Sequence, residues 1–175
     1  NISIGERNLL GRGQDLRLGL TLSGRRQEID LSFTEPYFLD RDITAGFDVF
    51  RKEVDFQEES SFDLETTGAS LRTNYTVAED LRHGVVYSLS RDKLSNIKAT
   101  ASRSVREQKA TSTTSSLGQN LAYDKRDSSI NPSDGYRIQL GQEAAGFGGD
   151  VHYLKHTVTY THHWPLWSNW VAKAQ

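Results

Sequence analysis

The stretch Asp15-Leu-Arg-Leu-Gly-Leu-Thr-Leu-Ser23 decides the fold class of this chain. Leucine occupies every second position, and the positions between the leucines carry charged, hydroxyl or glycine residues. Because successive side chains of a β-strand point to opposite faces, this segment forms a strand with one apolar and one polar face. The same pattern recurs to the C-terminus, which predicts an all-β protein with a large antiparallel sheet or barrel.

About ten strands follow from this alternation, and the first and last of them are incomplete. Turn and loop residues separate the alternating segments, as expected for strands joined by hairpins. The predicted strands are 2–5, 14–23, 27–34, 43–52, 62–75, 81–91, 113–124, 136–145, 152–162 and a last one that starts at residue 170.

The two faces of these strands differ in chemistry, and the sequence predicts that no Asp, Glu, Lys or Arg interrupts the apolar face. A charge near the middle of a bilayer costs roughly 2–4 kcal/mol for Arg or Lys, which would explain that absence if the apolar face meets lipid. The predicted lipid-facing residues are Leu16, Leu18, Leu20, Leu22, Ile29, Leu31, Phe33, Phe47, Val49, Leu71, Tyr87, Leu121, Ile138, Leu140, Val158 and Tyr160. The predicted lumen-facing residues are Arg17, Glu28, Asp30, Asp48, Arg72, Arg82, Asp124, Arg137 and Lys155.

The composition agrees with a sheet that has a polar interior. Hydrophobic residues make up only 35% of the 175 residues and the mean hydropathy is −0.62, yet the alternation is strict. A transmembrane β-barrel has this composition because only one face of each strand has to be apolar. No run of about 18 apolar residues exists, so the sequence predicts no transmembrane helix.

A soluble β-sandwich is the main alternative, because its strands also alternate and bury their apolar face. The predicted strands are often 9 to 11 residues or longer, whereas strands of soluble proteins usually have about 5–6 residues. Strand length therefore favours the membrane barrel.

The connections between the predicted strands alternate in character. One set contains all three prolines, including the segment 164–167, and carries aromatic residues at strand ends that suit a membrane–water interface. The other set includes the polar segments 51–61 and 91–114. Short turns at one end and longer loops at the other are typical of outer-membrane barrels. The predicted interface aromatics are Tyr37, Phe38, Trp164 and Trp167.

The sequence predicts no catalytic, metal or cofactor site. His152 and His156 would lie about 13 Å apart along a strand, too far to share one metal, and all five histidines are expected at the surface or the membrane interface. Asp124, Arg126 and Asp127 are expected to form an ion-pair network that faces the lumen. The chain has no cysteine, a net charge of −2 and no basic block, so no nucleic-acid partner is expected.

Three segments resemble one family of membrane proteins. Asn8-Leu-Leu-Gly-Arg-Gly-Gln14 resembles its first short periplasmic turn, and Phe33-Thr-Glu-Pro-Tyr-Phe38 resembles the turn after its fourth strand. Tyr123-Asp-Lys-Arg-Asp-Ser-Ser-Ile-Asn-Pro-Ser-Asp-Gly-Tyr-Arg137 resembles a later turn and is the most specific of the three. Their order and spacing are similar to those of the bacterial surface antigen family of outer-membrane assembly factors.

The resemblance implies a sixteen-stranded barrel of the Gram-negative outer membrane. Residues 1–175 would run from the end of its second strand to the start of its eleventh, without the periplasmic POTRA domains and the C-terminal strands. The implied function is folding and insertion of client outer-membrane proteins, without enzymatic chemistry or a cofactor. The implied partners are outer-membrane lipids, unfolded clients and accessory assembly lipoproteins. A related translocation or secretion barrel and a passive porin-like channel remain the alternatives.

Overall fold

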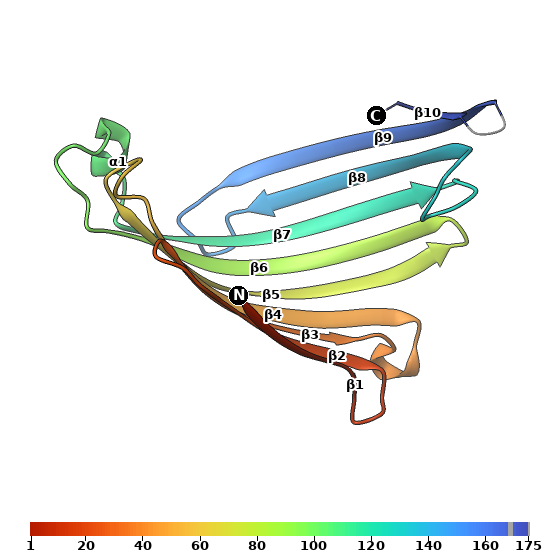
Figure 1. Cartoon of the computed structure of the whole chain (residues 1–175), viewed down its shortest axis with the longest axis horizontal. Helices are drawn as coiled ribbons and strands as arrows, with labels where there is room; N and C mark the ends of the chain where they lie inside the picture. Colours follow the sequence, from red (N-terminus) through yellow and green to blue (C-terminus); the bar gives the residue numbers. More distant parts are fainter. Residues whose placement is uncertain (168–169, 175) are drawn as a thin grey trace.

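The computed structural model places ten antiparallel strands side by side in chain order, from β1 to β10, in a single sheet (Figure 1). It describes residues 1–167 and 170–174. The strands are β1 (Ile2–Leu9), β2 (Gln14–Leu22), β3 (Arg26–Glu35), β4 (Ile43–Asp55), β5 (Asp63–Ala78), β6 (Leu81–Ser95), β7 (Thr111–Asp124), β8 (Gly135–Ala145), β9 (Tyr153–Trp167) and β10 (Trp170–Ala174).

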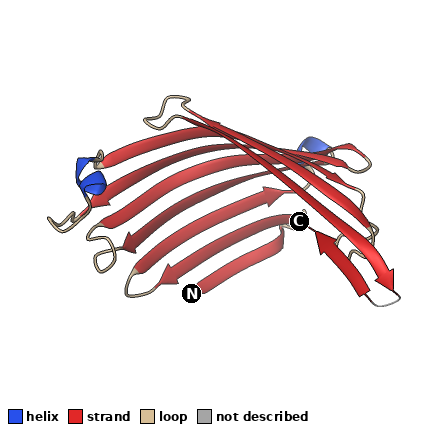
Figure 2. Cartoon of the chain, turned by 90° about the horizontal axis from the view of Figure 1, so that it is seen from above, coloured by secondary structure: helices blue, strands red, loops and turns tan. Residues whose placement is uncertain are grey.

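The sheet is curved and remains open between β1 and β10, which form its two edges (Figure 2). Because each strand is antiparallel to the next, successive connections fall at opposite ends of the sheet. Figure 1 shows α1 (Arg103–Glu107) and the long loops at one end, called the loop end below. The opposite end carries most of the shorter connections and η1 (Phe38–Asp40), and is called the turn end.

All ten predicted strands are present, but the central ones are longer than the sequence indicated. β4, β5 and β6 have 13, 16 and 15 residues. The segment 91–114, predicted as one long loop, contributes its first residues to β6 and its last residues to β7, and it holds the short helix α1. The prediction failed there because polar strand ends that pair only with each other carry no apolar alternation.

The segment 164–167 was predicted as a connection and is instead the end of β9. Pro165 lies opposite Val171 of β10, and the register shifts between Trp170 and Val171. Proline cannot donate a ladder hydrogen bond and is tolerated in strands mainly at edges and bulges. The irregular register at this site explains why the proline does not end the strand.

The described residues form a single sheet with no second layer packed against it, whereas a sandwich consists of two packed sheets. Among the described residues, only Ala101 and Ala122 are buried apolar side chains. Leu71 and Val158 are 62% and 69% exposed, so the apolar face lacks a protein partner within these residues. Neither described helix is long and apolar enough to cross a bilayer.

The loops at the loop end contact one another across several strands. The backbone carbonyl of Ser61 accepts a hydrogen bond from the Lys98 amide at 2.9 Å. The Asn96 side chain donates to the Asp63 carboxylate at 2.6 Å. The Asp150 carboxylate accepts from the Thr113 amide at 2.9 Å, which ties the connection between β8 and β9 to β7. These contacts join neighbouring hairpins beyond the backbone ladder.

Candidate functional site: a wall with two chemically different faces

The strand register places all the predicted lipid-facing residues on one face, called the apolar face below. Leu16 pairs with Phe33, Phe33 with Phe47, Phe47 with Leu71, and Leu71 with Tyr87. Directly paired residues of neighbouring strands point to the same side of a sheet. Further rows complete the face: Leu18–Leu31–Val49, Leu20–Ile29, Leu121–Leu140–Val158 and Ile138–Tyr160, with Leu22 two residues beyond Leu20.

The prediction that no charge lies on the apolar face is wrong near the ends of the strands. Arg51 pairs with Ile29 and Thr67, and Thr67 pairs with Arg91, so both arginines lie on this face toward the loop end. The error arose because β4 and β6 continue beyond their apolar stretch. Glu6 and Glu35 lie on the same face near the turn end, opposite Leu16 and Ala45. The charges border an apolar band instead of interrupting its centre.

Aromatic side chains collect on the apolar face toward the turn end. Ring centroids lie 6.1 Å apart for Tyr123 and Tyr136, 6.3 Å for Tyr136 and Tyr160, and 4.0 Å for His162 and Trp164. The predicted interface aromatics occur at the same end, and all four are exposed: Tyr37, Phe38, Trp164 and Trp167. Such a belt is typical of the level of lipid headgroups.

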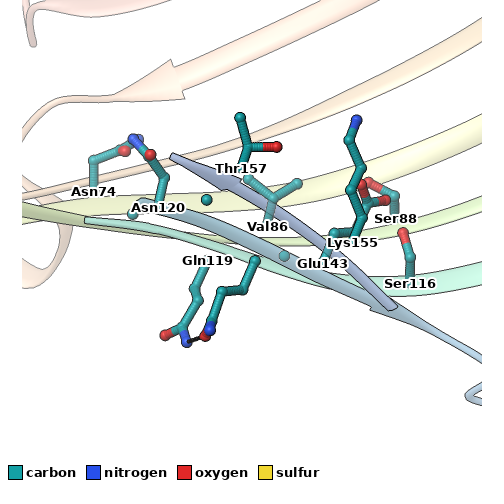
Figure 3. A pocket seen from close by; sticks show the side chains of 13 residues that line it. Asn74, Val86, Ser88, Ser116, Gln119, Asn120, Glu143, Lys155 and Thr157 are labelled. Atoms are coloured by element: carbon teal, nitrogen blue, oxygen red, sulfur yellow. Dashed lines mark hydrogen bonds between the residues drawn. The ribbon is translucent and has the colours of Figure 1, made fainter. Parts of the chain in front are cut away.

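The opposite face, called the polar face below, carries all the predicted lumen-facing residues. Its cross-strand pairs include Asp30–Gly19, Glu28–Lys52, Arg72–Val86, Arg82–Ala122 and Asp124–Arg137. Arg17, Asp48 and Lys155 complete it through Arg17–Ser32–Asp48 and Lys155–Glu143. A hollow of about 460 Å³ lies on this side. Figure 3 shows Asn120, Thr157 and Lys155 among the side chains that line it.

Arg72 is the centre of a hydrogen-bond network that joins three strands on the polar face. Its guanidinium forms an ion pair with Asp48 of β4 and donates to the Thr34 hydroxyl of β3 at 2.6 Å. The Ser70 hydroxyl donates to the same Asp48 carboxylate at 3.0 Å. The guanidinium crosses Gly46, where a Cβ would lie 2.9 Å from Nη2 of Arg72. Because Gly46 has no side chain, the Arg72 guanidinium can pass over it and reach β3.

We expect Arg72→Ala to lower the free energy of unfolding of the full-length protein by about 1–2 kcal/mol. The side chains of Arg72 and Asp48 are only 24% and 34% exposed, so the variant would leave the half-buried Asp48 carboxyl group without its ion-pair partner. The measurement is the urea midpoint in lipid vesicles. Arg82→Ala is the control, because Arg82 forms no ion pair within the described residues. Equal effects of the two variants would contradict a special role of the network.

The segment 124–137 forms a closed turn between β7 and β8. Asp124 accepts from Arg126 Nε at 2.7 Å and lies 3.8 Å from Arg137 Nε, as expected for an ion-pair network. The prediction is wrong for Asp127, which joins no ion pair of the described residues. Its carboxylate instead accepts from the amides of Ser133 at 2.9 Å and Asp134 at 3.1 Å.

These hydrogen bonds to the ionised carboxylate, first of all that from the Ser133 hydroxyl, lower the pKa of Asp127 to about 2. Since the pKa in the folded turn lies below the ordinary value, the stabilisation is complete above about pH 4 and is lost as the pH falls through about 2. We expect the amide resonances of Ser133 and Asp134 to shift in that window in NMR spectra of the full-length protein. Asp127→Asn should abolish the titration, and an unchanged midpoint in that variant would contradict the assignment.

The histidines do not all lie where the sequence placed them. His163 is only 6% exposed, and its Nδ1 has no hydrogen-bond partner within the described residues. The surface alternative of that prediction is wrong for His163, which lies on the polar face directly opposite Gly135, a residue without a side chain. Residues 1–167 and 170–174 hold no group of three or more His, Cys, Asp or Glu side chains suited to a metal. The absence of catalytic and cofactor sites stays a prediction.

Sequence reasoning missed a group of polar residues on the apolar face. Gln119, Gln142 and His156 occupy alternating positions that also carry Leu117, Leu140 and Val158. The two-residue period of a strand is enough to place these three side chains on the apolar face from the sequence alone. The hydrogen bonds among the three side chains can be identified only in the structure.

Comparison with known proteins identifies the family. Residues 8–175 match the model of the Omp85 superfamily domain. The chain belongs to the Omp85 superfamily. The fold of this Omp85 chain is similar to the crystal structure of BamA from Haemophilus ducreyi lacking POTRA domains 1–3, with a TM-score of 0.78 and 23% identity. The match covers 98% of this chain and 36% of that one.

Several sequence relatives of this Omp85 chain are assembly factors by name. It is 30% identical over 155 residues to outer membrane protein assembly factor BamA of Neorickettsia risticii, covering 89% of this chain and 21% of the relative. It is 29% identical to BamA of Nitratidesulfovibrio vulgaris, over 90% of this chain and 20% of that protein. The SAM50-like protein CG7639 of Drosophila melanogaster is 27% identical over 95% of this chain and 39% of its own length. The chain thus spans about a fifth of the bacterial relatives.

Proposed function

We propose that this chain is part of a barrel of the Gram-negative outer membrane that folds and inserts client outer-membrane proteins. The observation that carries the proposal is the register, which gathers the apolar residues on one face and the charged residues on the other across the whole sheet. In a barrel, the apolar face meets lipid and the polar face lines the lumen. The family and the BamA relatives support the assembly function.

Assembly of this kind requires no covalent chemistry. Unfolded clients carry unpaired strand edges, and an assembly barrel would recognise them by β-augmentation, in which backbone hydrogen bonds supply the affinity. The residues described above would act as the wall that holds the barrel in the membrane. The partners in this proposal are outer-membrane lipids, unfolded client proteins and accessory lipoproteins.

The test is client folding by the full-length protein reconstituted in phospholipid vesicles. An unfolded outer-membrane protein is added, and its folded fraction is followed by the mobility difference between heated and unheated samples. We expect faster folding than in vesicles without protein. No acceleration, together with a large steady conductance across a planar bilayer, would contradict the proposal and favour a passive channel.

A further inference from the structure

Five polar side chains form a continuous hydrogen-bonded chain on the apolar face, one on each strand from β5 to β9. The hydroxyl of Tyr75 lies 2.7 Å from Nδ1 of His83, and Nε2 of His83 lies 3.2 Å from the Gln119 carbonyl oxygen. The Gln119 amide donates to the Gln142 carbonyl oxygen at 2.7 Å, and the Gln142 amide lies 3.2 Å from Nδ1 of His156. We call this chain the polar track. Figure 3 shows Gln119 on the opposite side of the sheet from Asn120.

The polar track lies inside the apolar band. On the same face, Gln119 lies between Leu117 and Leu121 in β7, and His156 lies between Leu154 and Val158 in β9. Polar groups in hydrocarbon are costly unless they are hydrogen-bonded, so a polar line at these positions calls for a physical reason.

The polar track runs across the strands instead of along them. Tyr75 lies three residues from the turn-end terminus of β5 at Ala78, whereas His156 lies three residues from the loop-end terminus of β9 at Tyr153. Strands of membrane barrels tilt by about 35–45°, so a line across them also runs obliquely through the bilayer. The polar track therefore joins the neighbourhood of one membrane interface to that of the other.

The hydrogen bonds leave unused donors along the polar track. A glutamine carbonyl oxygen only accepts, so Nε2 of His83 carries a proton and its Nδ1 accepts from Tyr75. At the other end, Nδ1 of His156 accepts from Gln142, so its Nε2 carries a proton that no described side chain accepts. Each glutamine amide also keeps a second N–H. These donors line a hollow of about 200 Å³ beside Leu121, Leu140 and Val158.

We propose that the polar track lets phospholipid headgroups cross the bilayer along the outside of the barrel. The oxygens of the phosphate and glycerol esters, with their bound water, are acceptors that match the unused donors. The acyl chains would remain against the leucine and valine residues on either side. The activity is transbilayer movement of phospholipids, and it breaks no covalent bond. It rests on the membrane placement of the proposed function and goes beyond client assembly.

The experiment uses the full-length protein in phosphatidylcholine vesicles that contain a fluorescent short-chain phospholipid in both leaflets. Serum albumin extracts the probe from the outer leaflet only. Albumin is preferred to a small quencher because it is too large to pass through a barrel lumen. We expect the wild-type protein to make nearly all of the probe extractable, whereas about half remains in protein-free vesicles.

The Gln119→Leu/Gln142→Leu double variant removes the centre of the polar track and places apolar side chains in the apolar band. We expect its extraction of the inner-leaflet probe to be at least about tenfold slower than that of the wild type, because the headgroup loses hydrogen-bond partners in hydrocarbon. Gln139→Leu is the matched control, since the same exchange occurs on β8 but on the polar face. It should keep the wild-type rate.

Two results would overturn the polar-track proposal: no probe movement by the folded wild type, or equal rates for the wild type and the double variant. Folding of each variant is verified by its mobility difference on heating. Client folding is measured in the same vesicles. Persistent client folding without lipid movement rejects the polar track and retains the assembly function. Lipid movement that depends on the polar track without client folding supports the polar track and rejects the assembly function.

Discussion

Replacing Leu140 by arginine should destabilise the full-length barrel in a bilayer by about 2–4 kcal/mol, the cost of an arginine facing lipid near the bilayer centre. Leu140 is the middle residue of β8, is 42% exposed and lies between Leu121 and Val158 on the apolar face. An arginine there would place its charge in hydrocarbon. The measurement is the free energy of unfolding in urea, in phospholipid vesicles.

Gln139→Arg is the control for this experiment. Gln139 is the neighbouring residue and lies on the polar face, opposite Ala122 and Thr159, so its arginine would remain in water. We expect a change of less than about 0.5 kcal/mol, as for an ordinary surface substitution. A harmless Leu140→Arg, or equal losses for the two variants, would show that the apolar face does not meet lipid.

Replacing Gly135 by alanine should cost about 3 kcal/mol of stability, at the upper end for a single strained residue. Gly135 has φ +98°, and a Cβ there would lie 2.2 Å from the backbone oxygen of Lys125. The Lys125 amide donates to the backbone carbonyl of Tyr136 at 2.8 Å. The Lys125 carbonyl therefore cannot move away from the new Cβ without disturbing the start of β8. The measurement is again the urea midpoint of the full-length protein.

Gly11→Ala separates conformational strain from the steric clash. Gly11 has φ +73°, but a Cβ there would meet nothing within 4 Å. Only the cost of the left-handed conformation remains, about 1 kcal/mol. A loss for Gly135→Ala no larger than that for Gly11→Ala would contradict the importance of the Lys125 contact.

The alternation predicted the fold and the two faces because it depends only on local backbone geometry. It placed Leu18, Leu71 and Val158 on one face, and the register agrees. The prediction failed for Pro165, because a proline usually ends a strand but here lies within β9, next to a register shift in its pairing with β10. The same alternation also places Gln119 on the apolar face, but its position was not predicted because its neighbours on that face are apolar.

The partners of polar side chains could not be predicted in the same way. Asp127 was expected to pair with a cation and instead binds amides six and seven residues further along the chain. That geometry depends on how the turn closes, which the residue types alone do not fix. The ion pair of Arg126 in this turn is with Asp124, not with Asp127.

The sequence by itself determined that this protein is a wall with one apolar and one polar face, because side chains of an extended backbone alternate with a period of two. Only the tertiary structure decided which side chains meet across strands. Arg72 reaches Thr34, 38 residues earlier, and Gln119 reaches Gln142, 23 residues later. Such pairs depend on the register, and a shift of one residue between two strands would separate the side-chain pairs that join those strands.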